Sequence, residues 1–145
     1  MPRTPANFSI ITWRGSRLIR AAVEEVLRFE SSNQHGNHVS TAPAEIGGVA
    51  IPAGTFITLG IGAANRDPAE FADPDRLDVG RQPNRHLAFG SGPHVCAGLN
   101  VARLEGRIPI GRFLARFPNY ALSGTPPAAA APPFRGFTSI PVILN

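Results

Sequence analysis

A single cysteine constrains this 145-residue chain more than any other feature. Cys96 lies within residues 89–98, which read Phe-Gly-Ser-Gly-Pro-His-Val-Cys-Ala-Gly. A lone thiol forms neither an internal disulfide nor a multi-cysteine metal site. Gly90 and Gly92 let the backbone turn sharply and approach a ligand closely, and a predicted helix after Cys96 offers N–H groups that favour a thiolate. These surroundings suit an axial thiolate on haem iron, and the alternative is a structural buried thiol in a glycine-rich turn.

The spacing of residues in this loop resembles the signature of the cytochrome P450 family, Phe-x-x-Gly-x-(His or Arg)-x-Cys-x-Gly. Five residues stand at its fixed positions, namely Phe89, Gly92, His94, Cys96 and Gly98. The resemblance implies that Cys96 ligates the iron of haem b and that His94 bonds a haem propionate. It further implies that Phe89 packs near the thiolate and that Gly98 permits close approach of the following helix.

The same resemblance assigns two further histidines to the haem. His86 matches a propionate contact of bacterial members of the family, and His38 stands where the family usually has arginine. Histidine weakens such a contact, because its side chain is shorter than that of arginine and mostly neutral near pH 7. From the residues alone, His35 and His38 are alternatively simple loop histidines or a weak, incidental metal pair.

Upstream, residues 21–28 carry a Glu-x-x-Arg pattern on a predicted amphipathic helix. Glu25 and Arg28 lie three positions apart, so they share one helical face and are able to pair. On its own such a pair usually marks a solvated face. In this position it resembles the Glu-x-x-Arg helix of the P450 family, which implies a third basic residue, matched here by Arg76. The implied role of the three side chains is structural, since a buried arginine–carboxylate network is geometrically exacting.

Between these landmarks the sequence predicts a small mixed β-sheet. Two short apolar runs in residues 45–54 meet at Gly47-Gly48, which indicates a hairpin, and residues 55–61 read as another strand. Residues 65–71 are typical of a capped short helix and lead into a meander rich in proline and aspartate. The resemblance implies an α+β fold, the carboxy-terminal part of the P450 fold, with a cysteine-ligand loop, a proximal helix and a terminal β-hairpin.

The chain is much shorter than a whole monooxygenase of the family, and we find no acid–threonine pair of the family's distal helix. Residues 16–145 are therefore predicted to be a partial haem-binding domain, and residues 1–15 an unmatched segment. Residues 31–37 are almost entirely polar where relatives line a substrate pocket. Either the pocket takes a polar substrate, or this stretch no longer lines one.

The predicted helix after Cys96, over residues 99–114, contains residues that disfavour a helix. Pro109 removes a hydrogen bond and clashes with the preceding turn, which costs roughly 3 kcal/mol. Gly106 and Gly111 each cost roughly 1 kcal/mol relative to alanine. We interpret these residues as a sign of relaxed constraint. Beyond the helix, residues 125–133 read as an extended linker and residues 134–144 as the terminal strand.

Composition limits the classes of partner. The chain is 43% hydrophobic and 17% charged, which is typical of a globular protein. No apolar run reaches the roughly 18 residues that span a bilayer, and no leader precedes a cleavage site, so we expect a cytoplasmic protein without a membrane contact. The net charge of +4 is the only hint of nucleic acid, and no interleaved aromatic residues support it.

Four arginines follow Cys96, at positions 103, 107, 112 and 116. They form either a solvated face or a positive surface that steers an acidic electron donor such as a ferredoxin. The resemblance implies a monooxygenase that inserts one oxygen atom of O2 into a small organic substrate, with electrons from a ferredoxin and its reductase. The alternative is a truncated, inactive remnant that binds haem weakly or not at all.

Overall fold

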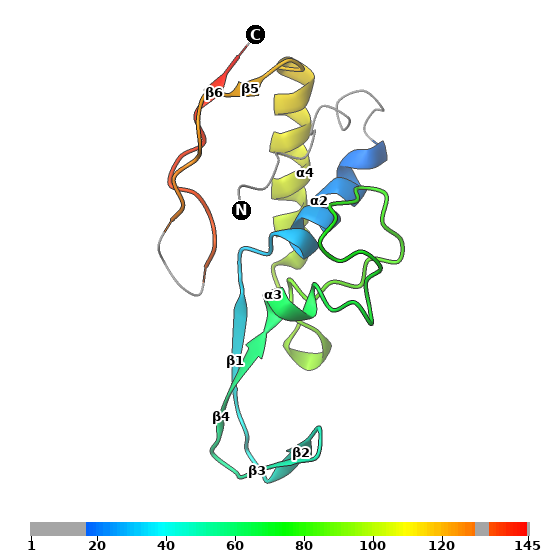
Figure 1. Cartoon of the computed structure of the whole chain (residues 1–145), viewed down its shortest axis with the longest axis vertical. Coiled ribbons are helices and arrows are strands. Elements are labelled where there is room, and N and C mark those ends of the chain that lie inside the picture. Colours follow the sequence, from blue (N-terminus) through cyan, green and yellow to red (C-terminus); the bar gives the residue numbers. More distant parts are fainter. Residues whose placement is uncertain (1–16, 130–133, 145) are drawn as a thin grey trace.

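The computed structural model describes residues 17–129 and 134–144 (Figure 1). The predicted unmatched segment, residues 1–15, lies outside the described residues, as does part of the predicted linker. Two long helices, α2 (Arg17–Phe29) and α4 (Leu99–Arg116), lie against each other. Neither these nor the shorter described helices combine the length and apolar character that a bilayer crossing requires.

The strands form three separate antiparallel pairs within the described residues, where the sequence predicted one mixed sheet. The pairs are β1 (His35–Val39) with β4 (Phe56–Gly60), β2 (Ala44–Ile46) with β3 (Val49–Ile51), and β5 (Ala121–Leu122) with β6 (Val142–Ile143). The hairpin predicted at Gly47-Gly48 is confirmed, since both glycines have positive φ between β2 and β3. Figure 1 shows the β1–β4 ribbon extending away from the two long helices.

The short helix predicted over residues 65–71 is wrong in its position. Helix α3 spans Ile61–Ala64, and turns follow it. The N–H groups of Arg66 and Asp67 bond only three residues back, to Ala63 and Ala64, so the helix tightens into turns and ends. Asp67 instead accepts hydrogen bonds from three downstream N–H groups, that of Ala69 on its carboxylate and those of Glu70 and Phe71 on its carbonyl.

The core between α2 and α4 is small and depends on close approach of the two helices. Ala22 of α2 and Leu114 of α4 are buried against each other. A Cβ at Gly106 would lie only 3.1 Å from Cγ1 of Val23, so glycine here allows the contact. Helix α4 also runs through Pro109 without interruption. Gly106 therefore has a packing role, which corrects its interpretation as a mere helix-weakening residue.

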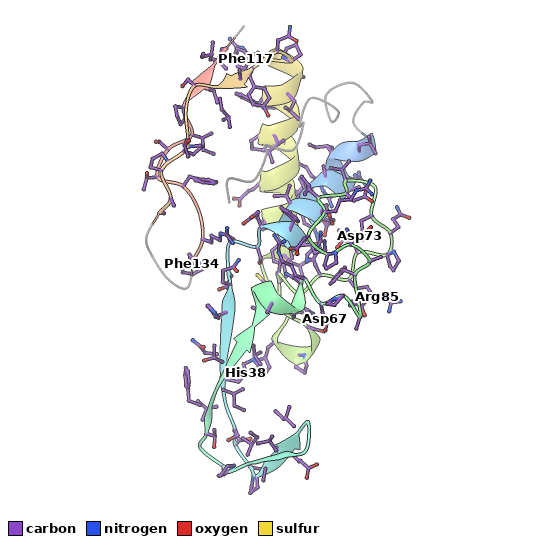
Figure 2. The ribbon with its side chains drawn as sticks, viewed as in Figure 1. His38, Asp67, Asp73, Arg85, Phe117 and Phe134 are labelled. Atoms are coloured by element: carbon purple, nitrogen blue, oxygen red, sulfur yellow. The ribbon has the colours of Figure 1, made fainter. Side chains whose placement is uncertain are left out.

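The carboxy-terminal strand is shorter than residues 134–144, over which the sequence predicted it. Only Val142–Ile143 forms a strand, and isolated bridges join Phe134 to Asn33 and Phe137 to Ala128. Figure 2 shows Phe134 beside the chain that leads into β1. The segment 134–144 is thus tied at its start to the polar stretch after α2, and at its end to β5.

Candidate haem-thiolate site

Residues 89–98, the Cys96 loop, form a closed turn in front of α4. The N–H of Cys96 donates to the carbonyl of Phe89 at 2.9 Å, and the Cys96 carbonyl accepts from the N–H of Leu99 at 3.2 Å. Gly90 and Gly92 have φ of 71° and 68°, a region that favours glycine. The Cys96 side chain is exposed. A buried structural thiol, the alternative from the sequence, is therefore wrong.

The Cys96 loop has open space at Gly92 and no side chain at Gly98, next to the sulfur, which suits close approach of a large flat cofactor. A Cβ at Gly92 would meet no atom within 4 Å, and one at Gly98 would lie 3.9 Å from Sγ of Cys96. A soft thiolate at the start of a helix is a ligand set that haem iron accepts. The residues present therefore fit the haem that the sequence resemblance implied.

His38 and His94, both predicted to contact propionates, meet in the structure. Their ring centroids lie 5.5 Å apart at an interplanar angle of 62°. His94 belongs to the Cys96 loop and His38 to β1, where Figure 2 labels it. Both side chains are exposed, so both are accessible to an anionic group. The described residues hold no group of three or more His, Cys, Asp or Glu suited to a metal ion.

His86, predicted to contact a propionate, has a buried ring that lies against Glu24 of α2. Its ring is 3% exposed, and Nε2 lies 3.1 Å from Oε2 of Glu24. Nδ1 accepts the N–H of Ala88 at 3.3 Å. Both ring nitrogens therefore have partners inside the protein, and the propionate contact of His86 stays a prediction. The position of His86, ten residues before Cys96, was readable from the sequence, whereas the direction of the ring was not.

Arg28 is the centre of the buried network that the Glu-x-x-Arg pattern indicated. Its side chain and that of Glu25 are almost fully buried, and they form a bidentate pair at 2.8 and 2.9 Å. The remaining three donors reach the carbonyls of Asn65, Pro74 and Arg76 at 2.9 to 3.1 Å. An arginine has five N–H donors, so every donor of Arg28 has a partner.

The third basic side chain of this network is Arg81, and the prediction of Arg76 is corrected. Nε of Arg81 lies 3.3 Å from Oε1 of Glu25. Arg76 contributes its carbonyl, and its side chain is exposed. Both arginines lie in the same meander, and the sequence offers no spacing rule that separates them, because the contact to Glu25 is long-range. We call Glu25, Arg28 and Arg81 the Glu25–Arg28 network.

Two asparagines that sequence reasoning missed complete this region. Nδ2 of Asn84 donates to Oε2 of Glu25 at 3.1 Å, and the N–H of Asp78 donates to Oε1 at 2.9 Å. Asn65 is fully buried, and its Oδ1 accepts the N–H of Leu87 at 2.6 Å. Burial alone would raise the pKa of Glu25, but its bonds to Arg28 and its other donors hold the pKa below its ordinary value.

The four arginines after Cys96 divide into two pairs. Arg103 and Arg107 both bind the carboxylate of Glu24 on α2. Arg112 and Arg116 are exposed. The first pair is therefore partly neutralised, which reduces the positive surface that was one of the two alternatives from the sequence.

The polar stretch at residues 31–37 is ordered by its own hydrogen bonds and by strand pairing. Ser31 is buried, and its hydroxyl donates to the carbonyl of Asn33 at 3.0 Å. Its carbonyl accepts a hydrogen bond from the side chain of Gln34. From His35 the chain enters β1 and pairs with β4. The polar side chains thus have a local structural use at the start of the ribbon.

Comparisons with known proteins agree with this geometry. A family model described as cytochrome P450 matches residues 17–141. Cytochrome P450 107B1 of Saccharopolyspora erythraea is 46% identical over 110 residues, and the alignment covers 75% of this chain and 27% of the relative. The biotin biosynthesis cytochrome P450 of Bacillus subtilis is 48% identical over 106 residues, covering 73% of this chain and 27% of the relative. The chain thus spans about a quarter of the length of these relatives.

Solved structures show the same arrangement of elements. P450BioI in complex with an acyl carrier protein ligated to hexadec-9Z-enoic acid superimposes with a TM-score of 0.89 and 40% identity, covering 94% of this chain and 36% of that one. The tirandamycin C-bound P450 monooxygenase TamI gives a TM-score of 0.88 and 39% identity, covering 94% and 35%. With the matched model, the Cys96 loop and the Glu25–Arg28 network in agreement, the chain belongs to the cytochrome P450 family.

Proposed function

We propose that this chain forms the thiolate-bearing part of a haem monooxygenase, with Cys96 as the axial ligand of haem b. The observation that carries the proposal is the exposed thiol of Cys96 in a loop closed by its own N–H. Bound haem supplies the oxygen-activating redox chemistry, and the electron-rich sulfur favours cleavage of the O–O bond.

The other residues of the site bind and orient the cofactor in this proposal. His38 and His94, whose rings lie 5.5 Å apart, would bind the haem propionates. Gly92 has no atom within 4 Å of its Cβ position, and Gly98 keeps a side chain away from the sulfur. The Glu25–Arg28 network holds the meander, and through Asn65 it fixes the N–H of Leu87 just before the Cys96 loop.

The reaction proposed for the complete catalytic unit is insertion of one oxygen atom of O2 into a small organic substrate. Two relatives support this class by name, the 6-deoxyerythronolide B hydroxylase of Saccharopolyspora erythraea and the vitamin D(3) 25-hydroxylase of Pseudonocardia autotrophica. Electrons would come from a ferredoxin-type donor, and the exposed Arg112 and Arg116 are the arginines of α4 left to attract an acidic surface.

The test is a visible absorption spectrum of the purified chain with haem, in the reduced state, with and without carbon monoxide. We expect a strongly red-shifted carbon monoxide band that Cys96→Ala removes. The His94→Gln variant should keep this band but bind haem less tightly, because only a propionate contact is lost. Identical, free-haem-like spectra for the unaltered chain and Cys96→Ala would overturn the proposal and favour the inactive remnant.

A further inference from the structure

A second ionic cluster lies between α2, α4 and the Cys96 loop. Its carboxylate is that of Glu24, the residue before Glu25. Arg103 binds Glu24 through two nitrogens, with Nε at 2.8 and 3.1 Å from the carboxylate oxygens and Nη2 at 2.8 Å. Arg107 approaches the same carboxylate at 3.4 Å and His86 at 3.1 Å. We call these four residues the Glu24–Arg103 cluster. It joins two helices that are distant in the sequence.

This cluster also contacts the Cys96 loop directly. The guanidinium carbon of Arg103 lies 5.1 Å from the centroid of the Phe89 ring, within the range of a cation–π contact. The ring of His86 lies 6.1 Å from the same ring. The Phe89 carbonyl is in turn the acceptor for the N–H of Cys96. A continuous path of contacts therefore leads from Glu24 through Arg103 and Phe89 to Cys96.

The path differs from the one that the Glu25–Arg28 network offers. That network reaches the chain ahead of the loop, where Asn65 binds the N–H of Leu87. Arg103 instead holds the aromatic residue whose carbonyl closes the loop. Its side chain is 27% exposed and that of Glu24 is 22% exposed, so a bidentate pair of this kind is partly shielded from water.

We propose that Arg103, oriented by Glu24, is a positioning residue for the Cys96 thiol and acts through Phe89. A guanidinium is planar and permanently charged, so it is able to bind a carboxylate along one edge and face an aromatic ring at the same time. A lysine would keep the charge and lose both geometric features. The consequence for haem ligation rests on the proposed function, whereas the effect on the loop does not.

The experiment measures amide hydrogen exchange of the 145-residue chain without haem, residue by residue. In Arg103→Gln the exchange of the Cys96 N–H should rise at least about tenfold, because the cation–π contact that holds Phe89 is lost. Arg112→Gln is the matched control, since Arg112 lies exposed on the same helix. Its exchange at Cys96 should equal that of the unaltered chain. Arg103→Lys should give an intermediate rate.

Amides in the β1–β4 ribbon provide the reference for the overall fold. If Arg103→Gln raises exchange equally at Cys96 and in the ribbon, the residue is a general stabiliser and the proposal is overturned. Unchanged exchange at Cys96 overturns it too, as does a lack of protection at Cys96 in the unaltered chain.

The second measurement adds haem and carbon monoxide to the same variants in the reduced state. Arg103→Gln should lower the fraction of the thiolate-type red-shifted band at equal haem occupancy, and Arg112→Gln should not. If the unaltered chain shows no such band, the proposed haem ligation fails, while the exchange data still decide whether Arg103 positions the loop. Arg103→Gln could instead show faster exchange at the Cys96 N–H and an undiminished red-shifted band. Arg103 would then position the loop only in the chain without haem, and the link to the thiolate would be overturned.

Discussion

The Glu25–Arg28 network and the Cys96 loop are built in opposite ways. The network is buried, and every donor of Arg28 has a protein partner. The loop is exposed, and a Cβ at Gly92 would meet no atom within 4 Å. A buried charge without partners is strongly destabilising, whereas an open surface leaves room for a ligand. The comparison separates the part of the chain that stabilises the fold from the part that presents chemistry.

The largest effect is expected at the centre of the network. Arg28→Lys keeps one charge but cannot supply five donors, and it leaves the buried Glu25 poorly paired. The free energy of unfolding should fall by about 3–5 kcal/mol, measured by urea unfolding followed by circular dichroism. The control is Arg85→Lys, an exposed arginine of the meander labelled in Figure 2. Equal midpoints for the two variants would contradict the central role of Arg28.

A smaller effect should distinguish the two candidate arginines of the meander. Arg81→Gln loses the contact to Glu25 and three carbonyl partners at 2.6 to 3.2 Å, those of Ala72, Asp73 and Arg76. Its free energy of unfolding should fall by about 1.5–3 kcal/mol. Arg76→Gln should leave the free energy unchanged, since Arg76 contributes only its carbonyl to Arg28 and Arg81. A reversed order would restore Arg76 as the third basic side chain.

The two glycines of α4 should respond differently to alanine. Gly111→Ala should stabilise the chain by about 1 kcal/mol, because the new Cβ would lie 3.9 Å from Ile19, an ordinary contact. Gly106→Ala should lose that gain, because its Cβ would crowd Val23 at 3.1 Å and valine is stiff at χ1. Thermal unfolding of both variants checks this, and an equal rise in Tm would show that α2 moves aside without penalty.

The smallest expected effect is the loss of the stability that Glu24 contributes when the pH is lowered. Burial alone would raise the pKa of Glu24, but its bonds to Arg103 and His86 hold the pKa below its ordinary value. A carboxylate with a lowered pKa contributes stability at higher pH, and this contribution is lost as the pH falls through and below the ordinary glutamate range. Arg103, Arg107 and His86 are the groups that face it.

Glu24→Gln isolates this acid response from that of Glu25, whose pKa is lowered as well. At neutral pH the variant should be less stable than the unaltered chain by no more than about 1 kcal/mol, since the pair is partly exposed. The difference should shrink on acidification, as urea midpoints over a pH series would show. A difference that grows at low pH would mean that the carboxylate is not stabilised by its neighbours.

The parts of the site that the sequence predicted are those fixed by short spacing. The turn that contains Cys96 and the pair of Glu25 and Arg28 each lie within a few residues, so local geometry determines them. Arg81 and Asn65 are joined to the pair of Glu25 and Arg28 by contacts between residues that are far apart in the sequence. No periodicity in the sequence encodes those contacts, and they had to be seen in three dimensions.

The details of the fold divide in the same way, into features set by neighbouring residues and features set by long-range contacts. The hairpin at Gly47-Gly48 was predictable, because the turn chemistry is carried by two adjacent residues. The role of Gly106 was not, because its helix propensity gives no information about Val23 on another helix. The direction of the His86 ring was likewise not predictable from the sequence, since it depends on Glu24 of α2.

The contact between His38 and His94 connects the bending of the β1–β4 ribbon with the binding of an anionic ligand. One ring belongs to the antiparallel β1–β4 ribbon and the other to the loop before α4 (Figure 1), so their separation follows the inclination of the ribbon. A dianion that contacts both rings would hold them at a fixed separation and so restrict the inclination of the ribbon. Stiffening would then extend along the ribbon to the β2–β3 hairpin, which lies beyond it in the chain. Ligand occupancy would thus be measurable as reduced motion at the far tip of the molecule.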